Sequence, residues 1–172
     1  MSSISEKLIN KINSKDAKIG IIGMGYVGIP LGLEFANQEF TVLGFDKDEK
    51  RVGDINAGKL VMKHIEQKDM QAFISKKGSA TTNFSELSEM DCLIICVPTP
   101  LDVHEQPDMS YVIAVSNEIS KNLTEGQLVV LESTTYPGTT KELVKPILEK
   151  SNMIAGKDFF LAYSPEREDP GN

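Results

Sequence analysis

Long apolar runs are missing from this sequence of 172 residues, and so is a targeting signal. No apolar stretch approaches the ~20 residues that a membrane-spanning helix requires. Residues 1–16 (MSSISEKLINKINSKD) are polar, and they lack the apolar core and small-residue cleavage site of a signal peptide. We therefore expect a protein without membrane contact, with the cytoplasm as its default location.

Runs of basic residues are missing too. Lys and Arg number 18 against 25 Asp and Glu, and the formal net charge is −7. This balance argues against a nucleic-acid surface as the main partner and is typical of simple solubility. Hydrophobic content of 40% and charged content of 25% are ordinary for one soluble globular domain.

Cysteine is scarce: the two present, Cys92 and Cys96, both lie in the apolar segment DCLIICVP. In an extended strand, residues four apart are separated by roughly 13 Å, whereas a disulfide requires Cα atoms within about 7 Å. With no histidine or third cysteine nearby, a metal or redox pair is not expected. Both residues are predicted to be small buried hydrophobic side chains.

What the sequence does contain is a regular alternation of short apolar segments with segments of helical spacing. Because the central apolar segments are continuous, we expect strands that are covered on both faces. The pattern predicts an α/β fold of the Rossmann type, a doubly wound, mostly parallel sheet flanked by helices, over residues 17–172, with a helical extension over 1–16. Strands are expected at 17–23, 40–46, 79–84, 91–99, 127–133 and 158–164, and helices at 4–14, 26–38, 47–58, 66–78, 109–123 and 139–151.

Three glycines follow the first predicted strand with Gly-x-Gly-x-x-Gly spacing. Gly23 allows a tight turn, Gly25 allows the backbone to approach a pyrophosphate, and Gly28 allows the following helix to pack against the strand. The phosphates would then lie at the amino end of that helix, next to N–H groups and the positive end of its dipole. A glycine turn with a purely structural role is the simpler alternative.

Asp46 ends the second predicted strand, roughly 20 residues after the glycines. At that point a carboxylate accepts hydrogen bonds from the ribose hydroxyls of an adenosine and repels a 2′-phosphate. The sequence therefore favours NAD over NADP as the cofactor. S-adenosylmethionine and FAD remain alternative adenosine ligands.

Four ordered motifs, KIGIIGMGYVGIPLG, CVPTPLD, ESTTYPGTT and SPERE followed by PG, carry a resemblance over residues 17–172. The chain resembles the N-terminal NAD-binding domain of the UDP-glucose/GDP-mannose dehydrogenase family, and most of all its UDP-N-acetylglucosamine 6-dehydrogenase branch. The resemblance implies polysaccharide biosynthesis, in which the C6 hydroxyl of a UDP-sugar is oxidised to a carboxylate with two NAD. In this family a cysteine traps the intermediate aldehyde.

Carried over to this sequence, the resemblance places Tyr26 and Val27 in the phosphate loop and Asp46 on the ribose. Arg51 matches a basic residue that reaches the adenosine side of the cofactor, although a solvated helix charge would also explain it. Thr99 matches a threonine that ends the fourth strand against the cofactor, with a turn-forming role as the alternative.

Three further residues are expected near the reacting centre. Thr134 matches a threonine close to the nicotinamide, unless it caps the next helix. Glu166 matches a glutamate near the reacting C6 that assists proton transfer, unless it is a surface charge. Arg167 is expected to face the sugar nucleotide. Many relatives carry a second glutamate where this chain has Pro170, so the role of that second carboxylate is not transferred.

The family's catalytic cysteine lies in a later Gly-x-Cys motif that has no match here. We therefore expect the cofactor-binding fragment of a longer homo-oligomeric enzyme, able to bind NAD but inactive alone. UDP-N-acetylglucosamine is the favoured substrate over UDP-glucose, UDP-N-acetylmannosamine and the galactosamine epimer. A hydroxyacid or 3-hydroxyacyl-CoA-type dehydrogenase and a non-enzymatic NAD-sensing module are the competing interpretations.

Overall fold

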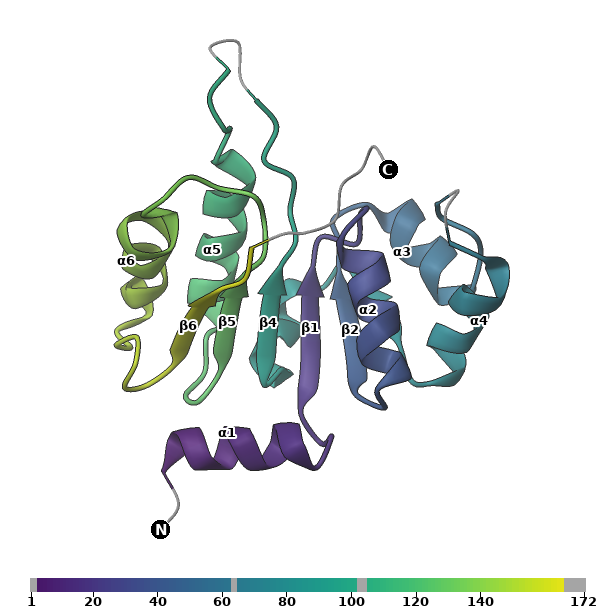
Figure 1. Cartoon of the computed structure of the whole chain (residues 1–172), viewed down its shortest axis with the longest axis horizontal. Helices are drawn as coiled ribbons and strands as arrows, with labels where there is room; N and C mark the ends of the chain where they lie inside the picture. Colours follow the sequence, from purple (N-terminus) through teal and green to yellow (C-terminus); the bar gives the residue numbers. More distant parts are fainter. Residues whose placement is uncertain (1–2, 63–64, 102–104, 166–172) are drawn as a thin grey trace.

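Six parallel strands lie side by side in the order β3-β2-β1-β4-β5-β6 in the computed structural model of the chain (Figure 1). The structure describes residues 3–62, 65–101 and 105–165. The predicted Rossmann-type fold is confirmed. The strands are β1 (Lys18–Ile22), β2 (Thr41–Phe45), β3 (Ser79–Thr81), β4 (Cys92–Ile95), β5 (Leu128–Leu131) and β6 (Phe160–Tyr163); the main helices are α1 (Ile4–Asn13), α2 (Gly28–Asn37), α3 (Glu49–Asn56), α4 (Gln67–Ser75), α5 (Ser110–Asn122) and α6 (Lys145–Leu148).

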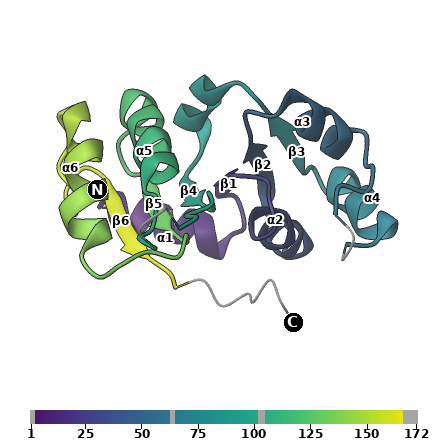
Figure 2. The same cartoon turned by 90° about the horizontal axis from the view of Figure 1, so that it is seen from above.

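The two faces of the sheet carry separate hydrophobic clusters. Viewed from above, α2 lies on one side of the sheet and α5 and α6 on the other (Figure 2). Successive residues of β4 alternate between the clusters: Cys92 and Ile94 belong to the α2 side, Leu93 and Ile95 to the α5–α6 side. Because both faces are covered, every position of β4 is apolar, which explains the continuous run seen in the sequence.

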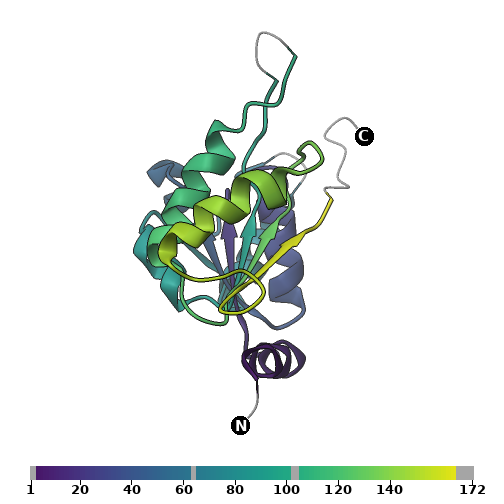
Figure 3. The same cartoon turned by 90° about the vertical axis from the view of Figure 1, so that its left-hand side faces the viewer.

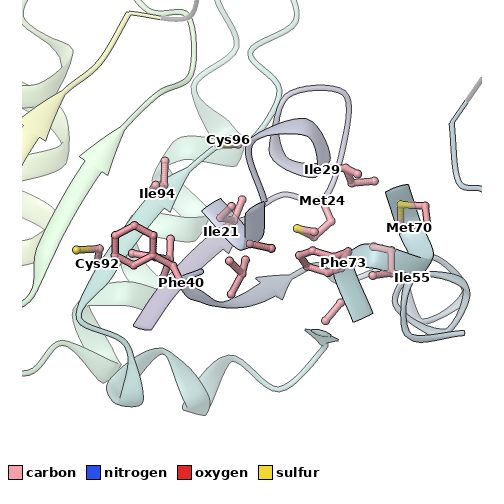
Figure 4. Close-up of a cluster of buried hydrophobic side chains, with 14 of the residues drawn as sticks. Ile21, Met24, Ile29, Phe40, Ile55, Met70, Phe73, Cys92, Ile94 and Cys96 are labelled. Atoms are coloured by element: carbon pink, nitrogen blue, oxygen red, sulfur yellow. The ribbon is translucent and has the colours of Figure 1, made fainter. Parts of the chain in front are cut away.

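The cluster on the α2 side joins β1, α2, α3 and α4 (Figure 4). Val27, Leu31 and Phe35 share one face of α2 by their spacing in the sequence, but their side chains are only partly buried against this cluster. The most buried positions, Gly28, Ile29, Gly32 and Ala36, are centred on the neighbouring face. Small residues at these positions allow the α2 backbone to approach the sheet closely: a Cβ added to Gly32 would lie 3.4 Å from Ile21 Cδ1.

The amino-terminal helix α1 runs beneath the amino ends of the strands (Figures 1 and 3). Ser3 and Glu6 form a reciprocal capping box at its start. Leu8 is buried, and Lys11 Nζ lies 2.6 Å from Asp91 Oδ1 just before β4. These contacts tie α1 to the sheet. None of the helices within the described ranges has the length and hydropathy that crossing a membrane demands.

The helical segment predicted at 139–151 is present but is not one regular helix. It begins as a wide π-type turn, η2 (Thr139–Val144), continues as α6 and ends as a tight 3₁₀ turn, η3 (Glu149–Ser151). Pro146 supplies the physical reason, because its ring would clash with the carbonyl of Glu142 in a regular α-helix. Widening the preceding turn relieves that clash. A short 3₁₀ helix before β4, η1 (Phe84–Glu89), was not predicted.

Candidate cofactor site

A cleft of about 760 Å³ opens outside the carboxyl ends of the strands, where β1 and β4 are neighbours and the strand order reverses. Ligands of open α/β sheets bind at this kind of topological switch point, and the volume is within the usual range for small-molecule pockets. The sequence-predicted residues that line it come from four strand ends: Gly23, Gly25, Tyr26 and Val27 after β1, Asp46 and Arg51 after β2, Thr99 after β4 and Thr134 after β5.

Two of the loop glycines are required by the fold itself. Gly23 has a φ of +96°, and a Cβ at this position would lie 2.7 Å from the carbonyl oxygen of Cys96. A Cβ on Gly28 would lie 2.0 Å from the carbonyl oxygen of Gly23. Either contact is too close for any side chain, so the turn between β1 and α2 and the docking of α2 both depend on these glycines.

Gly25 differs from them, because among the described residues a Cβ added there would meet no atom within 4 Å apart from its neighbours in the chain. The residue lines the cleft at the loop that leads into α2. Protein packing therefore leaves open space where a side chain would be, and that space suits a pyrophosphate resting against the backbone at a helix amino end. Pro30 falls in the first turn of α2, where the loss of one N–H is tolerated.

The Asp46 carboxylate is 9% exposed and is held by three donors. The backbone N–H of Met24 donates to Oδ2 over 3.0 Å, and the backbone N–H of Asp48 donates to Oδ1 over 3.0 Å. Arg51 Nη1 donates to Oδ2 over 3.1 Å, with the arginine side chain 42% exposed. The carboxylate is thus fixed beside the glycine loop, and the exposed Arg51 side chain is paired with it instead of being an isolated helix charge.

The structure brings Thr99 and Thr134 together at the ends of β4 and β5. The Thr99 hydroxyl donates to the backbone carbonyl of Thr134 over 2.7 Å. Thr134 does not cap the following helix, because the residue before η2 is Gly138, in a left-handed conformation. The buried hydroxyl of Ser133, which the sequence reasoning missed, donates to the carbonyl of Val97 over 2.7 Å and ties the two strand ends together.

Two more residues of the cleft wall were not predicted. Lys47 Nζ lies 5.3 Å from the centre of the Tyr111 ring, so the loop after β2 contacts α5. Tyr111 is 37% exposed. An aromatic residue at the start of the helix after β4 was the available signal in the sequence, but that helix was expected only to cover the sheet.

Glu166 and Arg167, like Pro170, fall outside the described residues. Cys92 and Cys96 are both buried side chains, as predicted. Burial, with a smaller effect of the Asp91 charge, raises the pKa of the Cys92 thiol to about 11. Within the ranges that the structure describes, no cluster of three or more histidine, cysteine or acidic side chains is arranged to hold a metal ion.

Comparisons with known proteins agree with this geometry. The sequence profile described as "UDP-glucose/GDP-mannose dehydrogenase family, NAD binding domain" matches residues 17–172. A UDP-N-acetyl-D-glucosamine 6-dehydrogenase of Pseudomonas aeruginosa is 39% identical over 159 residues, which cover 92% of this chain and 37% of the relative. The chain thus spans little more than a third of that relative's length.

Solved structures lead to the same family. An NDP-N-acetyl-D-galactosaminuronic acid dehydrogenase from Methanosarcina mazei Go1 is 37% identical with a TM-score of 0.85, covering 98% of this chain and 38% of that one. A ternary complex of GDP-mannose dehydrogenase from Pseudomonas aeruginosa is 30% identical with a TM-score of 0.83, covering 88% and 36%. The chain belongs to the UDP-glucose/GDP-mannose dehydrogenase family, and residues 17–172 are its NAD-binding domain.

Proposed function

We propose that the cleft holds NAD with its pyrophosphate against Gly25, its adenosine ribose at Asp46 and its nicotinamide end toward Thr99 and Thr134. The observation that carries this assignment is the open space at Gly25, because the protein alone does not require a glycine there. Tyr26 and Val27 complete the loop, and Arg51 lies on the adenosine side. When bound, NAD accepts the hydride that leaves the substrate carbon.

The residues of the chain itself would bind NAD and orient its ribose and nicotinamide. Asp46 is held by two backbone N–H groups, so its carboxylate meets a ribose without first having to be ordered. Thr99 and Thr134, linked through the Thr134 carbonyl, would fix the strand ends where the nicotinamide and the reacting carbon meet. Glu166 as a proton-transfer group and Arg167 as a contact to the sugar nucleotide stay predictions.

We further propose that a longer enzyme containing this domain oxidises the C6 hydroxyl of UDP-N-acetylglucosamine to a carboxylate with two NAD. Proteins named UDP-N-acetyl-D-glucosamine 6-dehydrogenase are 39% identical to the chain, whereas those named UDP-N-acetyl-D-mannosamine dehydrogenase are 31% to 35% identical. Cytoplasmic location, polysaccharide biosynthesis and assembly into homo-oligomers belong to the same proposal.

The chain alone is expected to bind NAD without oxidising a sugar nucleotide. The family's cysteine nucleophile is expected in another domain, and burial with a raised pKa makes the Cys92 thiol a poor substitute. An NAD-sensing module would also bind NAD without turnover. The two are separated by assaying a longer enzyme that contains the domain.

Thermal unfolding of the chain with and without cofactor tests the binding assignment. NAD at about a hundred times its Kd should stabilise the fold by ~2.7 kcal/mol, which corresponds to a Tm rise of roughly 5–11 °C for a domain of this size. The same concentration of NADP should produce a much smaller rise, because its 2′-phosphate would meet the Asp46 carboxylate. A rise with NADP and none with NAD would contradict the assignment.

Substrate choice is tested by following NADH formation by the longer enzyme with a panel of UDP-sugars. UDP-N-acetylglucosamine should give the highest kcat/KM and two NADH for each sugar oxidised. A higher kcat/KM for UDP-glucose or UDP-N-acetylmannosamine would overturn the substrate proposal and leave the NAD assignment intact. Oxidation of a hydroxyacid or a hydroxyacyl-CoA instead would replace the proposed reaction class.

A further inference from the structure

We infer that Arg51 can bind the 2′-phosphate of NADP and that the Asp46 carboxylate prevents this binding. Removing this one carboxylate would then convert the chain from rejecting NADP to binding it through Arg51. The inference rests on the proposed role of Asp46 at the adenosine ribose. It goes beyond that role by assigning Arg51 as the second specificity-determining residue and by naming the ligand chemistry, a phosphate monoester, that it would accept.

The first step concerns how many acceptor positions Asp46 has left. An ionised carboxylate offers about four lone-pair positions. Met24 N–H and Arg51 Nη1 both donate to Oδ2, and Asp48 N–H donates to Oδ1. About one position therefore remains. A ribose that donates from two neighbouring hydroxyls requires two, so one of the present donors has to leave when the ribose binds.

Arg51 is the donor that is free to leave. The Met24 and Asp48 donors are backbone groups, one in the glycine loop and the other at the residue whose side chain caps α3. The Arg51 guanidinium ends a flexible side chain that is 42% exposed. The guanidinium can return to solvent, and ribose hydroxyls can replace it as donors to Oδ2, so the buried carboxylate keeps its hydrogen bonds.

The released guanidinium would lie beside the ribose oxygens, because it starts at the carboxylate that the ribose would contact. Arginine stays protonated throughout the accessible pH range and binds phosphate with paired N–H groups. An arginine at this place is the feature with which Rossmann domains accept the 2′-phosphate of NADP. In the present chain the negative charge of Asp46 neutralises the positive charge of Arg51 and repels a second anion.

A second cation next to Asp46 supplies a matched control. Lys47 is adjacent in sequence and lines the same cleft, but its ammonium group lies over the Tyr111 ring of α5, 5.3 Å from the ring centre. Among the described residues, Arg51 forms a hydrogen bond with the Asp46 carboxylate over 3.1 Å, whereas Lys47 forms none with it. We therefore assign the 2′-phosphate to Arg51 and not to Lys47.

The experiment measures the Kd of NAD and of NADP by calorimetry for the wild-type chain and four variants: Asp46→Asn, Arg51→Met, Asp46→Asn/Arg51→Met and Asp46→Asn/Lys47→Met. Asp46→Asn should raise the Kd of NAD roughly tenfold, because one charged hydrogen bond to the ribose is lost. It should lower the Kd of NADP roughly tenfold, because one charged hydrogen bond to the 2′-phosphate is gained. Arg51→Met alone should change NAD affinity by less than about fivefold.

The double variants decide the inference. Adding Arg51→Met to Asp46→Asn should abolish the gain in NADP affinity and leave NAD affinity within about threefold of that of Asp46→Asn. Adding Lys47→Met to Asp46→Asn should preserve the gain in NADP affinity. NADP binding to Asp46→Asn should also weaken more steeply with salt than binding to the Arg51-free variant. Circular dichroism checks that each variant is folded, and Asp46→Ser replaces Asp46→Asn if the latter is not.

The possible failures are distinct. Unchanged NAD affinity in Asp46→Asn would overturn the ribose assignment and this inference with it. Weakened NAD binding without a gain for NADP, or with a gain that survives Arg51→Met, would overturn the inference alone. A gain that depends on Lys47 instead would show that the wrong cation was assigned.

Discussion

Gly25 and Gly28 occupy the same loop motif, but the structure predicts opposite consequences for replacing each by alanine. Apart from its chain neighbours, a methyl group on Gly25 meets no atom of the described residues within 4 Å, and Gly25 does not have a left-handed backbone conformation. Gly25→Ala should therefore leave the free energy of unfolding of the cofactor-free chain within about 0.5 kcal/mol of wild type. The Tm should move by no more than about 2 °C.

A methyl group on Gly28 would lie 2.0 Å from the carbonyl oxygen of Gly23, which is a backbone atom that cannot turn aside. Overpacking of this kind costs roughly 1–3 kcal/mol. At roughly 2–4 °C for each kcal/mol, the Tm of cofactor-free Gly28→Ala should fall by about 2–12 °C. The glycine motif thus contains two positions that serve the fold, Gly23 and Gly28, and one, Gly25, whose only evident constraint is a ligand.

With NAD present, by contrast, Gly25→Ala should be less stable than wild type. A methyl group that holds a phosphate away from the loop N–H groups forfeits a charged hydrogen bond, which weakens binding roughly tenfold to a hundredfold. At an NAD concentration of about a hundred times the wild-type Kd, a fiftyfold loss lowers the stabilisation from ~2.7 to ~0.6 kcal/mol. Differential scanning fluorimetry with and without NAD measures both effects in one series.

Gly53 provides the matched control for this series. It also has no neighbouring atom within 4 Å of an added Cβ, but it lies in the middle of α3 and does not line the cleft. Gly53→Ala should raise stability by ~0.5–1 kcal/mol through helix propensity and leave NAD affinity unchanged. If Gly25→Ala binds NAD as tightly as wild type, or destabilises the free chain as much as Gly28→Ala, the ligand-based explanation of Gly25 is refuted.

Further predictions concern buried polar groups. Gln127→Ala should destabilise the chain by ~2 kcal/mol in urea unfolding, because the buried Gln127 Nε2 donates to the carbonyls of Leu87 and Met90. The Met90 carbonyl would lose this donor, whereas the Leu87 carbonyl would keep the N–H of Met90. A loss below ~1 kcal/mol would contradict this. Ser116→Ala should be neutral or stabilising by up to ~1 kcal/mol, because the Ser116 hydroxyl is, among the described residues, a buried polar group without a hydrogen-bond partner. The pKa of the Cys92 thiol is about 11 in the folded state and about 9.0 in the unfolded state, so the free energy of unfolding should fall as the pH rises from 9 to 11. Cys92→Ala should remove that contribution to the pH dependence.

The element order and the sheet class followed from local patterns. Continuous apolar segments in alternation with helical spacing predicted strands covered on both faces, and five of the six helical segments agree in type with the structure. The sixth, at 139–151, contains Pro146, whose clash with the preceding turn depends on backbone geometry that periodicity does not report. For a related reason, the spacing of the large apolar residues does not identify the most buried face of α2, since small residues pack closest and contribute least to an apolar pattern.

The sequence by itself determined where the chain turns, which segments are buried and that a phosphate loop is followed by an acid, because backbone conformation and burial period depend on near neighbours. Only the tertiary structure decided which loop glycines the protein needs, how Asp46 divides its acceptor positions and which strand ends meet at Thr99 and Thr134. These properties depend on contacts between segments far apart in the chain. The topology of the sheet sets such contacts, and no local pattern contains them.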